Sequence, residues 1–319
     1  MRRTGLQLPV ITIDPDLIKS TAERNKGNVS PIGEMFGFRT PLNINLEKLR
    51  VPKFTSTEKP DDSDREIDYT TPLAELIKPR KDLLKTPSQI ENWLNANVHQ
   101  LGRPMQYIGR EANTDSPDLF EASDLRVLIV RLSSYDSVNG SLTHGALSQL
   151  VHSTAREKGF KAYVDHSYMP GLSGDAEFLR DSKVPWLYAR TSRRHPRDFD
   201  VILFSFALTM EIWNIIPALV YSGISPFKTM RDMDKPLNDR DQDPVIIFGG
   251  VVSDFIESLY GEVEGHRCVC DATLIGDGEF TLPKITNLLH KTLKEGKTRK
   301  DFLRAGHDLP EDQDFVTIS

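Results

Sequence analysis

Three short apolar segments, each running into small or acidic residues, are the feature that most constrains the fold of this chain. They are FDVILFSFAL (199–208), DPVIIFGGVV (243–252) and CDATLIGDGE (270–279). Continuous apolar runs of this length are typical of strands in a parallel sheet that is covered on both faces. Open α/β sheets bind ligands at the carboxyl ends of their strands, so the turns that end these segments predict a ligand site.

The composition excludes several classes of protein. The chain has 319 residues, 38% of them hydrophobic, and can bury the core of one large or two small domains. A net charge of −6 and a pI of about 5.8 do not favour a mainly electrostatic nucleic-acid binder. No apolar run approaches the roughly 18 to 20 residues that span a bilayer, and no secretory signal is recognisable, so we expect no membrane association. The two cysteines form no disulfide framework, which favours a reducing cytoplasm.

Three regions differ in pattern along the chain. Residues 1–85 are rich in Pro, Lys, Asp, Glu and Thr without any period, so we expect an extended, partly disordered N-terminal arm. Residues 86–122 are predicted to form a covering helix and a linker, because TPSQ from Thr86 has the pattern of a capping box and apolar residues recur at helical spacing from Ile90 to Val98. Residues 123–319 are predicted to form an α/β domain.

The third region alternates between strand and helix patterns. Strands are predicted over residues 125–132, 160–166, 184–189, 199–206, 244–250 and 271–278. Helices are predicted over residues 142–158, 212–222, 255–260 and 281–293, and Gly159 is a predicted C-cap. Strands joined by helices pair in parallel, so the alternation predicts a doubly wound α/β sheet of about five parallel strands.

The order of several short motifs resembles a known family. YIGREAN (107–113), an apolar strand, SRRHPRDFDVILFSF (192–206), SGI (222–224), DPVIIFGG (243–250) and IGDGE (275–279) follow one another over roughly residues 100–295. This succession is similar to the N-terminal cobalamin-binding-like domain of a family of radical S-adenosylmethionine (SAM) proteins. The resemblance implies a flavodoxin-like, cobalamin-binding-like fold, followed in the family by a barrel whose cysteine triplet holds an iron–sulphur cluster.

The cysteine content departs from that family. Cys268 and Cys270 are the only cysteines, so C-x3-C-x2-C does not occur and we expect no iron–sulphur cluster on this chain. The resemblance then implies a split system, in which a separate cluster-bearing radical SAM subunit is the partner. With His266, the two cysteines would make a poor zinc site, so we expect no metal and two buried reduced thiols.

The resemblance also implies residues that would hold a corrinoid. They lie in the turns after the strands: Ser133, Ser134, Ser205, Leu208, Gly249, Gly250, Gly276, Asp277, Gly278 and Glu279. The motif D-x-H-x-x-G would place a histidine ligand of cobalt at position 138, which is Val here. This leaves base-off cobalamin, bound by shape without a histidine, as the candidate cofactor. The structural alternative is that any doubly wound sheet needs small residues at these turns.

Two further motifs have a structural and a functional interpretation. Asp277 and Glu279 could present carboxylates to a ligand, but we favour a role at the N-terminus of the last helix. Arg193, Arg194 and Arg197 are predicted to contact a phosphate or a partner, or else to belong to a solvated loop. No third group completes an acid–base set, so catalysis by this chain alone is poorly supported and no catalytic residue is assigned.

Three functional hypotheses follow. The leading one is a cobalamin-binding-like component of a split radical SAM enzyme, which docks a cluster-bearing subunit and helps to bind a nucleic acid or a peptide. A nucleic-acid partner is left open by a local basic patch, formed by Arg190, Arg193, Arg194 and Arg197 with His195, and not by the net charge. The second hypothesis is a stand-alone corrinoid or nucleotide-binding module, and the third is a degenerate scaffold that binds only protein.

Overall fold

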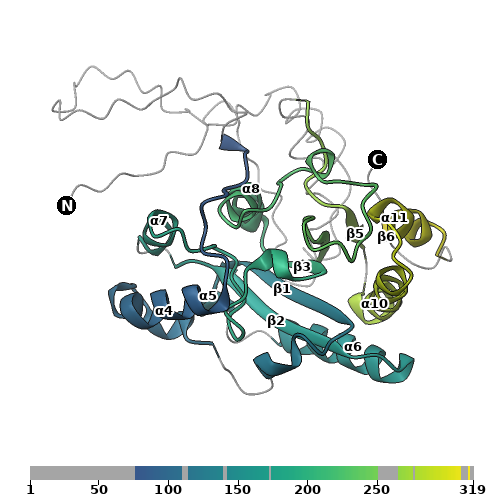
Figure 1. The fold of residues 1–319 in the computed structure, drawn as a ribbon, viewed down its shortest axis with the longest axis horizontal. Helices are drawn as coiled ribbons and strands as arrows, with labels where there is room; N and C mark the ends of the chain where they lie inside the picture. The colour runs from purple at the N-terminus through teal and green to yellow at the C-terminus, as the bar shows by residue number, and fades with distance from the viewer. Residues whose placement is uncertain are drawn as a thin grey trace, which may run out of the picture. The chain divides into compact units, whose positions relative to one another are not determined.

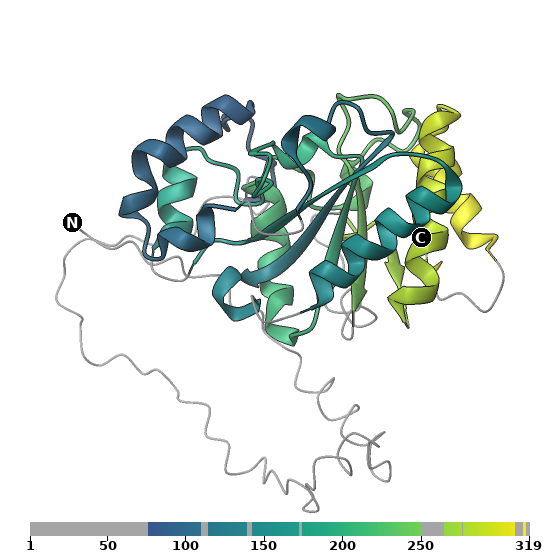
Figure 2. The same ribbon diagram turned by 90° about the horizontal axis from the view of Figure 1, so that it is seen from below.

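A twisted sheet with helices on both faces forms the centre of the described part of the chain (Figures 1 and 2). The computed structural model describes residues 76–109, 114–138, 142–171, 174–250, 265–275, 277–309 and 315–316. The strand order is β2-β1-β3-β4-β5-β6. The first five strands are parallel, and β6 pairs with β5 in the antiparallel sense. The prediction of a doubly wound sheet of about five parallel strands is confirmed, in the 2-1-3-4-5 order of flavodoxin-like folds.

The strands are β1 (Leu125–Ser134), β2 (Ala162–Met169), β3 (Val201–Phe206), β4 (Val245–Gly250), β5 (Ala272–Leu274) and β6 (Phe315–Val316). The α-helices are α4 (Pro87–Asn97), α5 (Tyr135–Val138), α6 (Thr143–Lys158), α7 (Asp175–Asp181), α8 (Ile215–Val220), α10 (Gly278–Lys294) and α11 (Arg299–His307). The 3-10 helices are η1 (Val98–Gln100), η2 (Pro104–Tyr107), η3 (Pro117–Leu119), η4 (Pro196–Asp198), η5 (Thr209–Asn214) and η6 (Lys228–Met230). None of these helices combines the length and the apolar character that a membrane crossing requires.

Alternate residues of each strand pack into two separate hydrophobic cores, because successive side chains of a strand point to opposite faces of the sheet. Val127 and Ile129 of β1, with Leu203 of β3, pack against α6, α10 and α11. Leu128 of β1 and Phe204 of β3 belong to the other core, beneath α4, α7 and α8. Figure 1 shows α6 and α8 on opposite sides of the sheet. Both faces of the sheet are therefore covered by helices and shielded from water, as the continuous apolar runs predicted.

Aspartates at the amino ends of the odd-numbered strands fix the pairing register. Asp124, just before β1, accepts a hydrogen bond from the backbone N–H of Lys161 at 2.8 Å. Asp200, just before β3, accepts one from Arg126 N–H of β1 at 2.7 Å. Asp271, just before β5, accepts one from Ile246 N–H of β4 at 2.7 Å. A slip by one residue would break these bonds and would also move each strand's side chains to the wrong face.

Two predicted helix ends are confirmed. Thr86 caps α4, with both hydrogen bonds of the capping box to Gln89 present. Gly159 ends α6 in the left-handed conformation at φ 75°. α11 was not predicted, although Thr298 and Asp301 form a second capping box at its start.

One predicted strand is wrong. Residues 184–189 are buried but form no strand, and their backbone bonds instead to the turn after α8. Trp186 N–H donates to Tyr221 O, and Leu187 N–H donates to Ser222 Oγ. The run is apolar because it fills the core of one face, which a sequence pattern does not distinguish from a central strand.

The last strand is shorter than predicted, because β5 spans only three residues. Cys268 and Cys270 precede it and so do not lie within a strand. The predicted helix over 255–260, and the N-terminal arm up to residue 75, lie outside the described residues.

Candidate functional site

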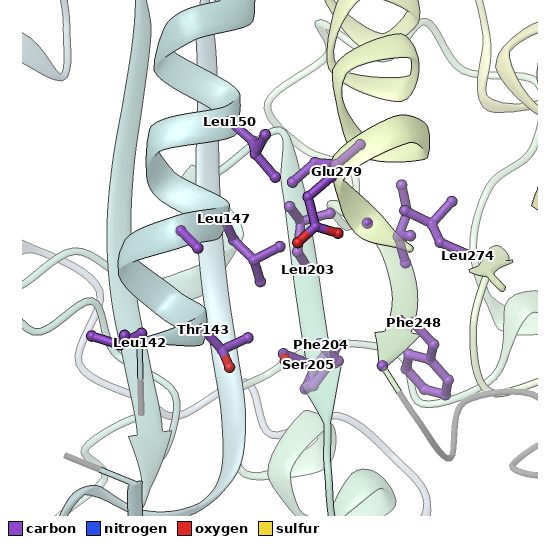
Figure 3. Close-up of a pocket in the computed structure, with 16 residues that line it drawn as sticks. Leu142, Thr143, Leu147, Leu150, Leu203, Phe204, Ser205, Phe248, Leu274 and Glu279 are labelled. Atoms are coloured by element: carbon purple, nitrogen blue, oxygen red, sulfur yellow. The ribbon is translucent and has the colours of Figure 1, made fainter. Parts of the chain in front are cut away.

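A pocket of about 350 Å³ opens over the carboxyl ends of β3 and β4 (Figure 3). Its floor is the sheet, and its walls are the first turns of α6 and α10 and the end of β5. It is lined by Leu142, Thr143, Ala146, Leu147, Leu150, Leu203, Phe204, Ser205, Ile247, Phe248, Gly249, Gly250, Leu274, Gly278, Glu279 and Leu282. No lysine, arginine or histidine is among these residues, so the pocket is an apolar site with one carboxylate.

The pocket exists because side chains become small where β3 and β4 end. Leu203 and Ile247 face it from within the sheet, and two positions further on the residues are Ser205 and Gly249. A Cβ at Gly249 would meet only Leu274, at 3.8 Å. A Cβ at Gly250 would lie 2.1 Å from Phe206 O, and φ is +105° there. Gly250 is thus required by the backbone, whereas Gly249 leaves room that a larger residue would fill.

The structure brings half of the predicted ligand-binding residues together. Ser205, Gly249, Gly250, Gly278 and Glu279 line the pocket. Ser133, Ser134, Leu208 and Asp277 do not line it, and Gly276 lies outside the described residues. Ligand binding by all ten stays a prediction.

The start of α10 differs from the expected cap. Asp277 occupies the N-cap position, but its side chain makes no capping hydrogen bond. Glu279 lies in the first turn, as predicted, where a negative charge is favoured by the helix dipole. Its carboxylate points toward the pocket opposite Leu147 (Figure 3).

Glu211 is an organising residue that the sequence did not reveal. It is 2% exposed and lies in η5, directly after the turn of SFAL. Its Oε2 accepts from the N–H groups of Ala207 and Leu208, and its Oε1 accepts from Ser133 Oγ at 2.6 Å. Arg131 of β1 supplies the counter-charge at 2.8 Å. One buried carboxylate therefore holds two predicted turns together. The only feature of the sequence that could have indicated this role is the position of Glu211 shortly after the apolar strand and the SFAL turn.

Exposed apolar side chains surround the carboxyl edge of the sheet. We name this set the apolar rim: Leu142, Leu208, Met210, Trp213 and Phe280. They come from the starts of α6 and α10 and from η5, the segments that follow β1, β5 and β3. Large exposed side chains gathered around a pocket are typical of an interaction surface.

The three predicted arginines have partners within the chain. Arg193 is buried, and its guanidinium bonds to Glu91 and to the carbonyl oxygens of Tyr107, Ile108 and Arg190.

Arg194 pairs with Glu121 at 2.7 Å and lies over the Phe120 ring. Arg197 donates to Asp241 O at 2.9 Å. Contact of these three arginines with a phosphate or a partner stays a prediction.

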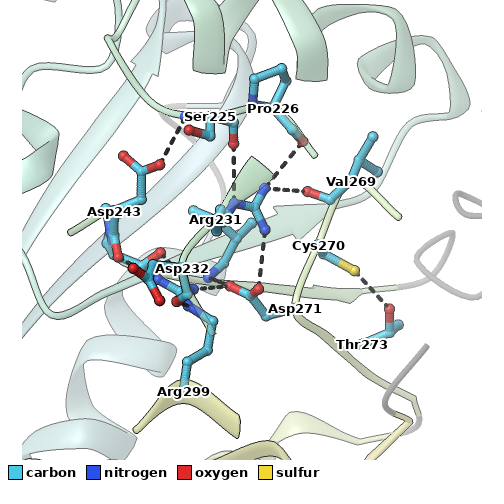
Figure 4. Close-up of polar contacts among 12 residues, drawn as sticks. Ser225, Pro226, Arg231, Asp232, Asp243, Val269, Cys270, Asp271, Thr273 and Arg299 are labelled. Atoms are coloured by element: carbon cyan, nitrogen blue, oxygen red, sulfur yellow. Dashed lines mark hydrogen bonds and ion pairs between the residues drawn. The ribbon is translucent and has the colours of Figure 1, made fainter. Parts of the chain in front are cut away.

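A buried charge cluster lies at the amino end of β5 (Figure 4). Asp271 is 0% exposed and pairs with Arg231 at 3.2 Å and with Arg299 at 2.5 Å, both also 0% exposed at their side chains. Burial alone would raise the pKa of Asp271, but the two arginines outweigh it and hold the pKa below its usual value. Arg231 and Arg299 also donate to the carbonyl oxygens of Val269 and Pro244. The cluster is sealed from solvent, so its role is structural.

Both cysteines are buried and neither forms a disulfide bond, as predicted. Cys270 Sγ lies 3.5 Å from Thr273 Oγ1. Within the ranges that the structure describes, no three His, Cys, Asp or Glu side chains are grouped closely enough to hold a metal ion.

Comparison with protein families identifies the context of this site. Residues 149–311, just over half of the chain, match the family described as radical SAM proteins, N-terminal. The chain belongs to this family. No curated protein and no solved structure gives a significant match. The predicted association with radical SAM proteins is confirmed. The matched segment includes β3, β4, β5 and α10, which carry most of the pocket lining.

Replacement of Asp271 by Asn should strongly destabilise the radical SAM N-terminal domain. The variant keeps an acceptor for Ile246 N–H but leaves two buried guanidinium groups without a counter-charge, which costs about 3–5 kcal/mol. Urea denaturation measures the loss. Glu295→Gln, which removes an exposed pair with Lys297, is the control and should change nothing measurable. A loss below about 1 kcal/mol for Asp271→Asn, the range of exposed pairs, would contradict this role.

The two adjacent glycines should respond differently to alanine. Gly250→Ala should lower the free energy of unfolding by more than about 1 kcal/mol, because the left-handed backbone and the Phe206 carbonyl both oppose a Cβ. Gly249→Ala should fold with wild-type stability. Thermal and urea unfolding of both variants test this, and equal stabilities would show that Gly250 is not constrained by its backbone.

Two buried histidines should make the domain less stable in mild acid. Burial lowers the pKa of His144 and of His195 to about 3 in the fold, so the unfolded chain binds protons that the folded chain does not. Their contribution is complete above about pH 6.5 and is lost as the pH falls toward 3, by at most about 1.4 kcal/mol per pH unit for each histidine.

The measurement is urea denaturation at pH 7 and pH 5. The double variant His144→Asn/His195→Asn should lose less stability than the wild type over this interval, since an asparagine side chain does not titrate. At the second position the new side chain can still accept the hydrogen bond from Arg197 N–H that His195 Nδ1 accepts in the wild type. Equal losses in the two proteins would rule out these histidines as the cause.

Proposed function

We propose that this domain is the ligand-binding, cluster-free component of a radical SAM enzyme system. Its pocket receives the heterocyclic end of a base-off corrinoid, and its apolar rim docks a cluster-bearing subunit. The single observation that carries the proposal is the apolar pocket at the carboxyl ends of β3 and β4, lined by Ser205, Gly249 and Gly250.

The lining fits one part of such a cofactor. A flat, uncharged aromatic base gains from apolar walls and from glycines that allow close approach of the backbone. The lining offers no cation for a phosphate, so the phosphate of a nucleotide tail would lie outside the mouth. When bound, a corrinoid supplies radical or alkyl-transfer chemistry at its cobalt.

Cobalt would receive no histidine from the turn after β1. Position 138 is Val, and Asp136 of the same turn pairs with Arg103. The residues that would hold the cofactor are therefore those that line the pocket, and Glu211 holds the turn of Ser133 to the turn of Leu208 beside it. These residues bind and orient; no proton transfer is assigned to them.

The docking proposal has two supports. Radical SAM chemistry needs three cysteines for the cluster, and these 319 residues contain two, both buried beside the Asp271 cluster. Leu142 of the apolar rim lines the pocket, and Phe280 follows the lining residue Glu279, so a subunit seated on these side chains would cover a ligand held there. We place the assembly in the reducing cytoplasm, and the substrate is a nucleic acid or a peptide, the classes that the resemblance implies.

Titration of the purified protein with aquocobalamin and with cobinamide, which lacks the nucleotide tail, tests the cofactor. Cobalamin should bind with the absorption spectrum of its base-off form, and cobinamide should bind at least about tenfold more weakly. Gly249→Val fills the pocket and should weaken cobalamin binding by at least about tenfold, a loss of about 1.4 kcal/mol.

Gly145→Val is the matched control, because position 145 lies on the exposed side of α6 with no atom within 4 Å of an added Cβ. It should bind cobalamin as the wild type does. Equal affinities for cobalamin and cobinamide, or an unchanged affinity in Gly249→Val, would refute the assignment of the pocket to the nucleotide tail.

A further inference from the structure

A second group of buried polar side chains lies at the carboxyl end of β2 and includes none of the residues that line the pocket. At its centre is Arg190, which is 4% exposed. Its guanidinium carbon lies 4.9 Å from the ring centroid of Tyr107, 5.6 Å from that of Tyr168 and 5.5 Å from that of Tyr188. We name these three side chains the tyrosine cage.

Arg190 has no counter-charge among the described residues. No carboxylate forms an ion pair with it, and its buried Nε and Nη1 atoms have no hydrogen-bond partner. Asp175 is committed elsewhere, because it accepts from Tyr107 Oη and from Gly102 N–H, both at 2.8 Å. Attraction to aromatic faces offsets only part of the cost of burying a cation. A negative ligand would supply what the fold does not.

Two neighbours of the tyrosine cage also carry buried polar atoms without partners. Gln106 is 3% exposed, and neither its Oε1 nor its Nε2 is hydrogen-bonded. His144 is 5% exposed, its Nε2 has no partner, and its ring lies 5.1 Å from the Tyr168 ring. Buried polar atoms in folded proteins are nearly always hydrogen-bonded. Three such side chains around one set of rings indicate a ligand rather than a packing accident.

The loop that carries Arg190 is rigidly built. Asp165, 0% exposed, accepts from the N–H groups of Thr191 and Ser192 at 3.0 and 2.8 Å. Arg190 N–H donates to His166 O at 2.9 Å. Arg193 holds a positive φ of 60° and bonds to the carbonyl oxygen of Arg190. A strained backbone and a loop held by several buried hydrogen bonds are typical of binding sites that are preorganised before the ligand binds.

We propose that Arg190 and the tyrosine cage bind an oxyanion, the carboxylate or phosphate group of a small ligand, with Gln106 as the second polar contact. A guanidinium group donates several hydrogen bonds in one plane and so matches either oxyanion. The site differs in chemistry from the pocket, whose lining holds no cation. It does not depend on corrinoid binding, so either proposal can fail alone.

Thermal unfolding in sodium phosphate, in sodium acetate and in sodium chloride at equal ionic strength tests the site. At least one of the two oxyanions should raise the Tm of the wild type above its value in chloride, and the rise should saturate with concentration. A larger rise in phosphate would indicate a phosphate group as the natural ligand, and a larger rise in acetate would indicate a carboxylate. Arg190→Met should show no such rise. In chloride its Tm should equal or exceed that of the wild type, because the variant removes a buried cation that has no partner.

Arg126→Met is the matched control. Arg126 is similarly buried and lies over the Phe120 ring, but it has Asp200 as a counter-charge. This variant should lose stability and keep the oxyanion response. Gln106→Leu should fold and show a weaker response, and it decides the matter if Arg190→Met does not fold. No oxyanion-specific rise in the wild type, or the wild-type rise in either Arg190→Met or Gln106→Leu, would overturn the proposal.

Discussion

The candidate site depends on one interaction, the buried ion pairs of Asp271 with Arg231 and Arg299. Asp271 holds the amino end of β5 against β4 through Ile246 N–H, and it joins that strand to α11 through Arg299. Because β5 has only three residues, its backbone hydrogen bonds to β4 are few and fix its pairing register only weakly. The chain that leaves β5 forms the start of α10 and thus one wall of the pocket. A charge cluster at one edge of the sheet therefore holds the strand that leads into a wall of the pocket at the other edge.

The two edges of the sheet are built from different chemistry. At the amino edge, Asp124, Asp200 and Asp271 bind neighbouring strands. At the carboxyl edge small residues lie near the ends of β3 and β4, as at Ser205 and Gly249, and the buried carboxylates Glu211 and Asp165 hold neighbouring turns. The amino edge is thus joined by hydrogen bonds between carboxylates and the backbone of neighbouring strands, whereas the carboxyl edge contains the open space of the pocket, where ligands of such sheets bind.

The carboxyl edge itself offers two environments. Over β3 and β4 an apolar pocket suits an uncharged ring, whereas beyond β2 a caged guanidinium suits an oxyanion. Both lie in a domain of the radical SAM family and are held by buried carboxylates, Glu211 beside the pocket and Asp165 beneath the cage.

The sequence by itself determined the parallel sheet, the capping box at Thr86 and the small residues at the ends of β3 and β4, because periodicity and turn chemistry are local. It misassigned residues 184–189, since burial in a core and burial in a sheet leave the same apolar pattern. Only the tertiary structure decided that Glu211 joins two turns and that Arg190 lies among three tyrosine rings, with no carboxylate paired to it in the part of the chain that the structure describes. The contacts of Glu211 with Ser133 and of Arg190 with Tyr107 join residues dozens of positions apart, and the cost of burying a charge depends on neighbours that no local pattern specifies.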